Sequence, residues 1–436
     1  MLILIKNGYV IDPASRREGI FDILVQGDRI SKVDKEIDAE KAMAPAGEQE
    51  LKVIDARGKY IMPGFIDLHV HLREPGFEYK ETIATGALAA AAGGYTSICP
   101  MPNTKPVTDS PEVVELVLDR ARRQAAVNIL PVGAITLGQE GKELADLSAL
   151  KDAGAVALSE DGKSVMDSAL YAEAMRQAAK LGIPIFAHCE DKSLAGKGAI
   201  NAGGKAQELG LPGISNAVED IITARDILLA KDTGAQLHIC HISTRDSARM
   251  VGLAKQERLR VTGEVCPHHF ILSDEDIQRD DADYKMNPPL RSRADIQALK
   301  EALRDGIVDV ISTDHAPHSE EEKRKSCKEA PFGIVGSETA FALTWTELVK
   351  TGYLTPGQMV EKMSVNPAKI LGIDRGCIGE GWVADLTIVD PEAEYVIDKR
   401  KFLSKGKNTP FHGRKVTGRV EYTFVAGKLV YQNQLN

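Results

Sequence analysis

Short apolar runs alternate with longer amphipathic stretches through the middle of the chain. The short runs predict eight buried strands, at 65–72, 96–103, 128–136, 155–161, 183–190, 236–243, 258–269 and 308–318. The longer stretches have helical spacing of apolar residues, at 81–94, 110–124, 167–182, 217–234 and 292–306. Eight strands alternating with helices over roughly 290 residues predict a (β/α)8 barrel. A doubly wound open sheet is the alternative, but no glycine-rich dinucleotide loop follows an early strand.

Both ends of the chain have a different pattern from the middle. Alternating apolar and polar positions, broken by Gly- and Asp-containing turns, predict strands at 2–12, 22–34, 51–61, 384–390, 393–398 and 418–431. Two strand-rich ends around one barrel predict a single β-domain assembled from both termini. We therefore expect a β-domain at 1–62 and 373–436, with the catalytic barrel at 63–372.

Composition and charge limit the classes of function. Hydrophobic residues make up 43% and charged residues 27%, the balance of a soluble globular protein with a large core. No apolar run approaches the ~20 residues that span a bilayer, and the start turns polar too soon for a signal peptide, so we expect a cytoplasmic protein. The net charge of -9, without a block of Lys and Arg, argues against nucleic-acid binding. Six scattered cysteines without a CxxC pair predict buried free thiols.

The residues that suggest chemistry gather at the predicted carboxyl ends of the barrel strands, where this fold forms its active sites. They are His69, His71, Asn103, Asp161, His188, His241 and Asp314. Buried imidazoles and carboxylates need partners, and several that converge on one barrel mouth are best satisfied by a cation. Four histidines and two carboxylates exceed the needs of one tetrahedral zinc and suit two ions.

Strand parity predicts which of these side chains share a face. Alternate residues of the first barrel strand point to one side, which groups Asp67, His69, His71 and Arg73 if the strand extends that far. His238 and His241 have opposite parity, so only one of them can face the barrel interior. We expect His241 to do so and His238 to pack among the helices. His268 and His269 also close a strand, where they could hydrogen-bond the ligands from outside or serve the structure alone.

An ordered set of motifs resembles the dihydroorotases of the multifunctional-enzyme-like bacterial class, in the amidohydrolase superfamily. The motifs are DLHVHLREPG, MPNT, AHCED, HICHIST, GEVCPHHF, MNPPLR, STDHAPH and PFGIVGSETA. They run in order from Asp67 to Ala340, and the strand-rich ends are similar to the small β-sandwich of that family. The resemblance therefore implies a TIM barrel with a β-sandwich domain built from both termini.

The resemblance also implies two Zn²⁺ ions per chain. The implied ligands of one ion are His69, His71 and Asp314, and those of the other are His188 and His241. Asp161 matches the position of an aspartate that bridges the metals, with Glu160 as the alternative acid. Many relatives carry a carboxylated lysine on the fourth strand, but AGAVALS has no lysine. This difference points away from hydantoinases and allantoinases.

The activity implied is the reversible cyclisation of N-carbamoyl-L-aspartate to L-dihydroorotate in de novo pyrimidine (UMP) biosynthesis. Asp314 would be the catalytic proton carrier. The implied substrate contacts are His71, Arg73, Asn103, Asn287, His318, Phe332 and Gly333. Arg73 can clamp a carboxylate with two parallel hydrogen bonds, which a lysine cannot reproduce. The charged stretch at 319–330 is expected to be a solvated loop, with a mobile lid as the alternative because it directly follows His318.

Two other interpretations remain open at this point. The chain could be another cyclic amidohydrolase, such as a dihydropyrimidinase (hydantoinase) or an allantoinase. It could also be a non-catalytic homologue that supports aspartate carbamoyltransferase, although such a protein should have lost metal ligands, and every expected ligand position is filled. We expect a small-molecule substrate and a homo-oligomer, with aspartate carbamoyltransferase as a candidate partner.

Overall fold

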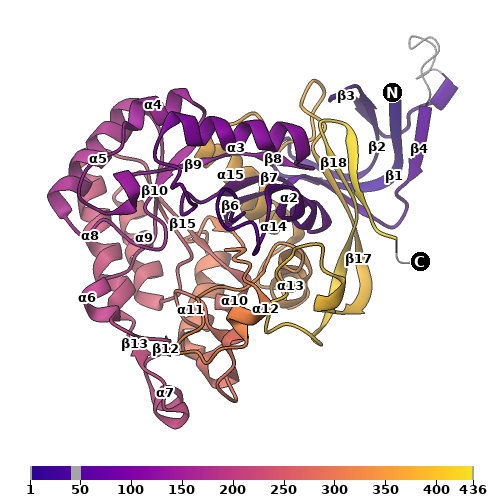
Figure 1. Ribbon diagram of the computed structural model, residues 1–436. Helices are drawn as coiled ribbons and strands as arrows, with labels where there is room; N and C mark the ends of the chain where they lie inside the picture. Colours follow the sequence, from indigo (N-terminus) through magenta and orange to yellow (C-terminus); the bar gives the residue numbers. More distant parts are fainter. Residues whose placement is uncertain (1, 41–50, 435–436) are drawn as a thin grey trace.

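The computed structural model describes residues 2–40 and 51–434 of the 436-residue chain. A helix-wrapped barrel occupies one side of the molecule, and a β-rich domain that contains both termini packs against it (Figure 1). Within the described residues, no helix combines the length and the apolar character that crossing a bilayer requires. All six cysteines are buried and free, as predicted.

Short parallel strands form the barrel, in the order of the sequence. They are β6 (Phe65–Val70), β7 (Tyr95–Pro100), β8 (Asn128–Ile129), β9 (Val132–Ala134), β10 (Ala157–Ser159), β11 (Ile185–Ala187), β14 (Leu237–Ile239), β15 (Val261–Val265) and β16 (Val310–Ile311). One row joins β6, β7 and β8, and a second joins β9 through β16. β8 and β9 are the two halves of the predicted third strand, and a bridge between Val70 and His315 closes the ring. The eight predicted barrel strands are therefore confirmed.

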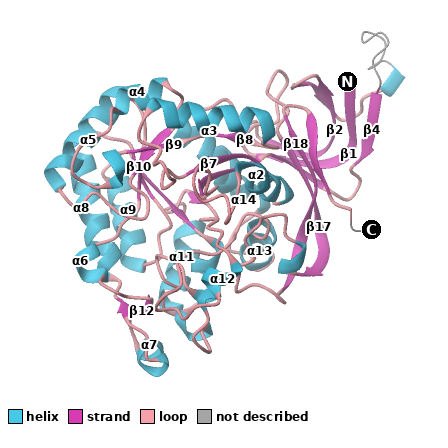
Figure 2. Cartoon of the chain, viewed as in Figure 1, coloured by secondary structure: helices cyan, strands magenta, loops and turns pink. Residues whose placement is uncertain are grey.

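Helices surround the barrel strands (Figure 2). The longer ones are α2 (Ile83–Ala92), α3 (Pro111–Gln124), α4 (Leu147–Asp152), α5 (Ser168–Leu181), α8 (Ala217–Thr233), α9 (Arg245–Gln256) and α11 (Arg293–Arg304). All five predicted helices are present, with ends that differ by no more than two residues. Local chemistry explains this agreement. For example, the Asp167 side chain accepts from the first free N–H groups of α5, and Gly182 ends that helix in the left-handed conformation.

Shorter elements fill the connections between strands and helices. They are α6 (Lys192–Ala195), β12 (Ile200–Asn201), α7 (Gly204–Leu209), β13 (Gly213–Ile214), α10 (Pro267–Ile271), α12 (Glu320–Lys323), α13 (Ala340–Thr344), α14 (Pro356–Val360) and α15 (Asn366–Leu371). Two π-helical turns, at Trp345–Val349 and Glu361–Val365, extend α13 and α14.

The β-rich domain draws its strands from both ends of the chain. They are β1 (Leu2–Asp12), β2 (Arg17–Gln26), β3 (Arg29–Asp34), β4 (Leu51–Asp55), β5 (Tyr60–Pro63), β17 (Leu386–Val396), β18 (Lys415–Val425) and β19 (Lys428–Gln432). The order is β19-β18-β17-β5-β1-β2-β3, and β4 pairs with β1. The two ends meet where β5 lies antiparallel to β17, with Met62 opposite Thr387. The strands predicted at 384–390 and 393–398 form one continuous strand, β17.

Buried hydrogen bonds connect this domain to the barrel. The Glu81 carboxylate, just before α2, accepts from the Ser404 hydroxyl and from the Lys405 N–H. Glu81 also lies 3.5 Å from His315, the residue after Asp314. Asn408 donates to the carbonyl oxygens of Ala316 (3.1 Å) and Gly333 (3.0 Å). The segment 404–408 of the terminal domain thus supports loops at the barrel mouth.

Candidate metal centre and active site

The six predicted metal ligands come together at the carboxyl ends of the barrel strands. His69 belongs to β6, and the others follow the ends of strands β6, β10, β11, β14 and β16, as His71, Asp161, His188, His241 and Asp314. All six side chains are buried. Parallel strands bring these positions to one mouth although up to 245 residues separate them in the sequence, from His69 to Asp314.

Asp161 lies at the centre of the cluster. Its Oδ1 is 3.2 Å from His69 Nε2, 3.6 Å from His188 Nδ1 and 3.8 Å from His241 Nε2. Its Oδ2 is 3.6 Å from His71 Nε2. One carboxylate therefore contacts both predicted ligand sets, as a bridge between two ions requires.

Asp314 completes one of the two sets. Its Oδ1 is 3.1 Å from His71 Nε2 and 3.7 Å from His69 Nε2. Burial alone would raise the pKa of the Asp314 carboxyl. The hydrogen bond with His71 and the charge of His69 outweigh that effect and lower the pKa. Asp314 is therefore a carboxylate anion at neutral pH.

Two observations show that these residues fit metal ions. Among the described residues, the buried His69 Nε2 has no hydrogen-bond partner, although it faces the carboxylates of Asp161 and Asp314. His188 Nδ1 and His241 Nε2 lie only 3.0 Å apart, so two lone-pair nitrogens face the same point. Imidazole nitrogens and carboxylate oxygens are the donors that zinc prefers in catalytic sites.

The outward nitrogens of three of these rings also have partners. His69 Nδ1 lies 3.0 Å from Glu264, His71 Nδ1 lies 3.0 Å from the Asn103 carbonyl oxygen, and His188 Nε2 lies 3.2 Å from Glu190. A ring that donates its N–H outward presents the lone pair of its other nitrogen to a metal. The partners thus orient the rings for ligation.

Glu160, the alternative bridging acid, faces away from the cluster. Its carboxylate accepts from the Thr136 N–H at 3.1 Å and from the Thr136 hydroxyl. Burial raises the pKa of Glu160. The geometry therefore favours Asp161 as the bridging residue.

The first barrel strand does not present its alternate residues as parity predicted. Asp67 does not reach the cavity, because its carboxylate accepts from the Thr313 N–H (3.1 Å) and hydroxyl (2.6 Å). Burial raises the pKa of Asp67 to about 7. β6 ends at Val70, and Arg73 reaches the cavity through a left-handed backbone turn, with φ of 61°. His241 (φ 33°) and Asp314 (φ 46°) also have positive φ, which is uncommon outside glycine and clusters at functional sites.

A cavity of about 150 Å³ lies above the cluster. Its lining includes most of the predicted ligands and substrate contacts, namely His71, Arg73, Asn103, Asp161, His188, His241, Asn287, Asp314, Phe332 and Gly333. His69 is buried beneath the other ligands. His318 lies behind the lining, where its Nε2 is 3.3 Å from the Arg73 guanidinium and 2.7 Å from the Phe332 carbonyl oxygen. His318 therefore supports the predicted contacts instead of lining the cavity.

The segment over the cavity is held tightly at Gly333. This glycine has φ of 125°, and a Cβ there would lie 2.5 Å from the Ala316 Cβ, so no larger residue fits without a shift. The Lys323 ammonium donates to the carbonyl oxygens of Pro331 (3.2 Å) and Gly333 (2.8 Å). Most charged residues of the stretch 319–330 are exposed, as expected of a solvated loop, but Lys323 is buried and ties the stretch to the roof of the cavity.

The expectation that His238 packs among helices is wrong. Its ring lies between strands, with Nε2 3.1 Å from Glu264 and Nδ1 2.9 Å from the Thr262 hydroxyl. Glu264 lies between His238 and His69 and is one of the residues that the sequence analysis missed. The sequence feature that could have identified Glu264 is a carboxylate within the apolar run of β15. Together with Cys240 and His69, Glu264 forms a buried group whose ligand atoms lie within 4.8 Å of one another.

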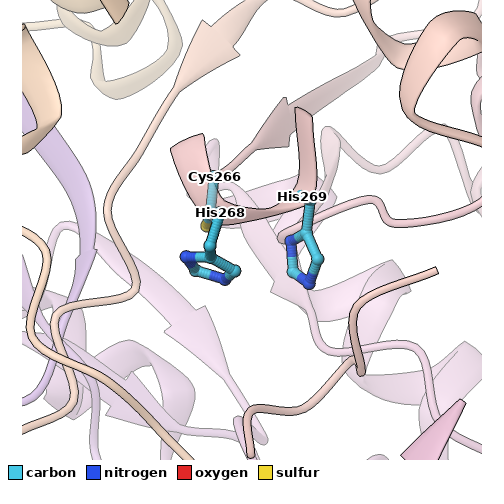
Figure 3. Close-up of side chains that lie close together, drawn as sticks. All are labelled: Cys266, His268 and His269. Atoms are coloured by element: carbon cyan, nitrogen blue, oxygen red, sulfur yellow. The ribbon is translucent and has the colours of Figure 1, made fainter. Parts of the chain in front are cut away.

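His268 and His269 lie on α10, next to Cys266 (Figure 3). Their ring centroids are 4.2 Å apart, and His269 Nε2 donates to the Pro288 carbonyl oxygen at 2.9 Å. Burial lowers the pKa of His268 to about 4, so its ring is neutral. His269 therefore has a clear structural role in holding the loop that carries Asn287.

Comparisons with known proteins agree with this architecture. A family model described as dihydro-orotase-like matches residues 58–247. A dihydroorotase of Geobacillus sp. (strain WCH70) is 49% identical over 435 residues, with 99% of each chain covered. A dihydroorotase of Pelotomaculum thermopropionicum is 47% identical, with 100% of each chain covered. Among solved structures, an L-hydantoinase (dihydropyrimidinase) from Arthrobacter aurescens matches with a TM-score of 0.87 and 27% identity, covering 99% of this chain and 96% of that chain.

A TIM barrel with a β-sandwich from both termini, shared with the hydantoinases, defines this protein as an amidohydrolase. The hydantoinases share the fold at 24–27% identity, whereas the dihydroorotases reach 46–50% over nearly the whole chain. The chain belongs to the dihydroorotase family.

Proposed function

We propose that this protein is a zinc-dependent dihydroorotase that interconverts N-carbamoyl-L-aspartate and L-dihydroorotate. The observation that carries the proposal is the position of Asp161, which contacts all four histidines of the cluster below a cavity lined by Arg73 and Asn287. His69, His71 and Asp314 would hold one zinc, and His188 and His241 the other. When bound, two zinc ions lower the pKa of a water molecule and polarise the amide carbonyl.

The chain's own residues provide proton transfer and orientation. In ring opening, the Asp314 carboxylate accepts a proton from the attacking water and delivers it to the ring nitrogen as the amide bond breaks. In ring closure, the same carboxylate moves the proton in the opposite direction. Its lowered pKa keeps the Asp314 carboxyl ionised, the state in which a proton acceptor must begin.

Arg73 is the group that suits a substrate with a carboxylate. Its guanidinium lines the cavity, and its Nε donates to the Pro317 carbonyl oxygen at 3.2 Å, which fixes the side chain. The chain carries a net charge of -9, so an anionic substrate needs a local cation. Asn103 donates to Asp161 (3.1 Å) and also faces the cavity, which places an amide beside both metal ligands and substrate.

The test is a combined metal and activity measurement on the purified protein. We expect about two equivalents of zinc per chain and turnover of dihydroorotate in both directions. Hydantoin, dihydrouracil and allantoin should be much poorer substrates. Efficient turnover of hydantoin instead would assign the protein to the hydantoinase activity, and bound metal without any turnover would favour a non-catalytic partner of aspartate carbamoyltransferase. The reaction would take place in the cytoplasm.

Replacement of Arg73 by alanine should lower kcat/KM for dihydroorotate. A charge-assisted bidentate pair is worth about 1.5–3 kcal/mol, or roughly ten- to a hundredfold. The zinc content should stay near that of the wild type, because the Arg73 guanidinium hydrogen-bonds to Pro317 and His318, neither of which is a predicted ligand. Steady-state kinetics and metal analysis check both expectations.

Two comparisons separate recognition from support of the structure. Arg73→Lys keeps the positive charge but loses the planar guanidinium group. It should therefore recover only part of the kcat/KM that Arg73→Ala loses. Dihydrouracil lacks the carboxylate, so Arg73→Ala should change its slow turnover little. Equal losses with both rings would show that Arg73 only stabilises the site.

A further inference from the structure

One carboxylate outside the predicted site contacts both a metal ligand and a substrate contact. Glu190 Oε2 lies 3.2 Å from His188 Nε2, and the Asn287 side chain lies close enough to the same carboxylate to lower its pKa. His188 turns its other nitrogen, Nδ1, toward His241 and Asp161. Asn287 lines the cavity. Glu190 is therefore the shared neighbour of two groups with different predicted roles.

The backbone fixes Glu190 in this position. Its N–H donates to the Ser164 hydroxyl at 3.1 Å, and the Ser164 hydroxyl donates in turn to the His188 carbonyl oxygen. Ser164 is buried, has a left-handed backbone (φ 58°), and lies three residues after Asp161. The loop that carries the bridging aspartate thus also holds the segment 188–190. The Glu190 side chain is only 14% exposed, so water competes little for its carboxylate.

The Asn287 loop is held from a second side. His269 donates to the carbonyl oxygen of Pro288, the next residue, at 2.9 Å. The neighbouring Glu190 carboxylate is then the group that can accept from the Asn287 amide and fix it relative to the metal cluster. If Glu190 were lost, the backbone of this loop would stay in place while the amide could rotate.

We propose that Glu190 is a positioning residue that orients His188 for the second metal ion and Asn287 for the substrate, and so links the two binding events. The first half follows from chemistry: an N–H···carboxylate bond fixes the tautomer of a ligating imidazole and raises its basicity. The second half rests on the proposed function, because it assigns Asn287 to substrate binding.

The first experiment uses no substrate. Metal-free protein, wild type or variant, is titrated with Co²⁺ against a chromophoric chelator, which gives an affinity for each of the two sites. Glu190→Ala should weaken one site about 10- to 100-fold and leave the other nearly unchanged, the range typical of such outer partners. Glu190→Gln keeps an acceptor for His188 and should recover part of the affinity. Asp191→Asn is the matched control: the adjacent side chain caps α6 and contacts neither His188 nor Asn287.

The second experiment measures KM for dihydroorotate at saturating metal. Glu190→Ala should raise KM, and the double variant with Asn287→Ala should raise it no further than Asn287→Ala alone, because both changes remove one interaction. Unchanged metal affinities in a folded Glu190→Ala protein would overturn the proposal. A weakened metal site with an unchanged KM would overturn the link to the substrate. Failure of the wild type to turn over dihydroorotate would refute the proposed function but leave the metal titration valid.

Discussion

Asp314→Asn should abolish turnover in both directions while the fold stays intact. Asparagine has almost the same size and keeps an oxygen that can face His71, but it cannot take up a proton. General acid–base groups contribute typically 10²–10⁴-fold, and Asp314 is also a predicted metal ligand, so we expect at least the upper part of that range. Assays of ring opening and ring closure, with circular dichroism as a check of folding, measure the effect.

Asp309→Asn serves as the control for this experiment. Asp309 precedes β16 at the opposite end of the same strand, where it pairs with Lys255 at 2.6 Å and accepts from the Gly263 N–H. Its loss should lower stability slightly and leave kcat within a few-fold of wild type. Catalysis by Asp314→Asn within tenfold of wild type would exclude the proton-transfer role.

The second large effect is expected at Asp161. Because its carboxylate contacts all four histidines, Asp161→Ala should weaken both metal sites and reduce bound zinc from about two equivalents to less than one after dialysis. Turnover should fall in proportion to the metal lost. Elemental analysis of dialysed protein, followed by activity after zinc is added back, distinguishes weakened binding from misfolding.

Glu160→Ala provides the contrast at the adjacent position. It removes the acceptor of the Thr136 N–H and hydroxyl, so a loss of stability is expected, about 1–3 kcal/mol for a buried donor left without a partner. The zinc content should stay near that of wild type. The opposite pattern, with metal lost from Glu160→Ala and kept by Asp161→Ala, would assign the bridge to Glu160.

The clustering of the six predicted ligands could be foreseen from the sequence because of a topological rule. Parallel barrel strands bring their carboxyl ends to one mouth, so the position of His188 or Asp314 within its own strand determines its place in the molecule. This prediction does not depend on the conformation of the loops. The barrel helices were predicted closely for a different reason. Apolar spacing and helix caps such as Asp167 are local signals in the sequence.

Other features depend on contacts that local patterns do not encode. Glu264 lies against His69, which is 195 residues earlier in the chain. Arg73 reaches the cavity through a left-handed turn beyond the end of β6, which strand parity cannot predict. Asp67 pairs with Thr313, which is 246 residues later in the chain. The parity argument assigned only His241 to the barrel interior, but His238 contacts Glu264, which in turn lies against His69.

The hydrogen bonds from segment 404–408 have a consequence for dissecting the protein. Asn408 accepts from the His318 N–H at 3.1 Å and donates to Ala316 and Gly333, and Ser404 donates to Glu81. A fragment that stops before β17 would keep all the predicted metal ligands but lose these hydrogen bonds, so the buried Glu81 carboxylate and the carbonyl oxygens of Ala316 and Gly333 would have fewer donors. We therefore expect the barrel alone to be less stable at its mouth than the whole protein. Domain exchange between related enzymes should transfer residues 404–408 together with the barrel, and split versions of the protein should regain function only when the two pieces complement each other.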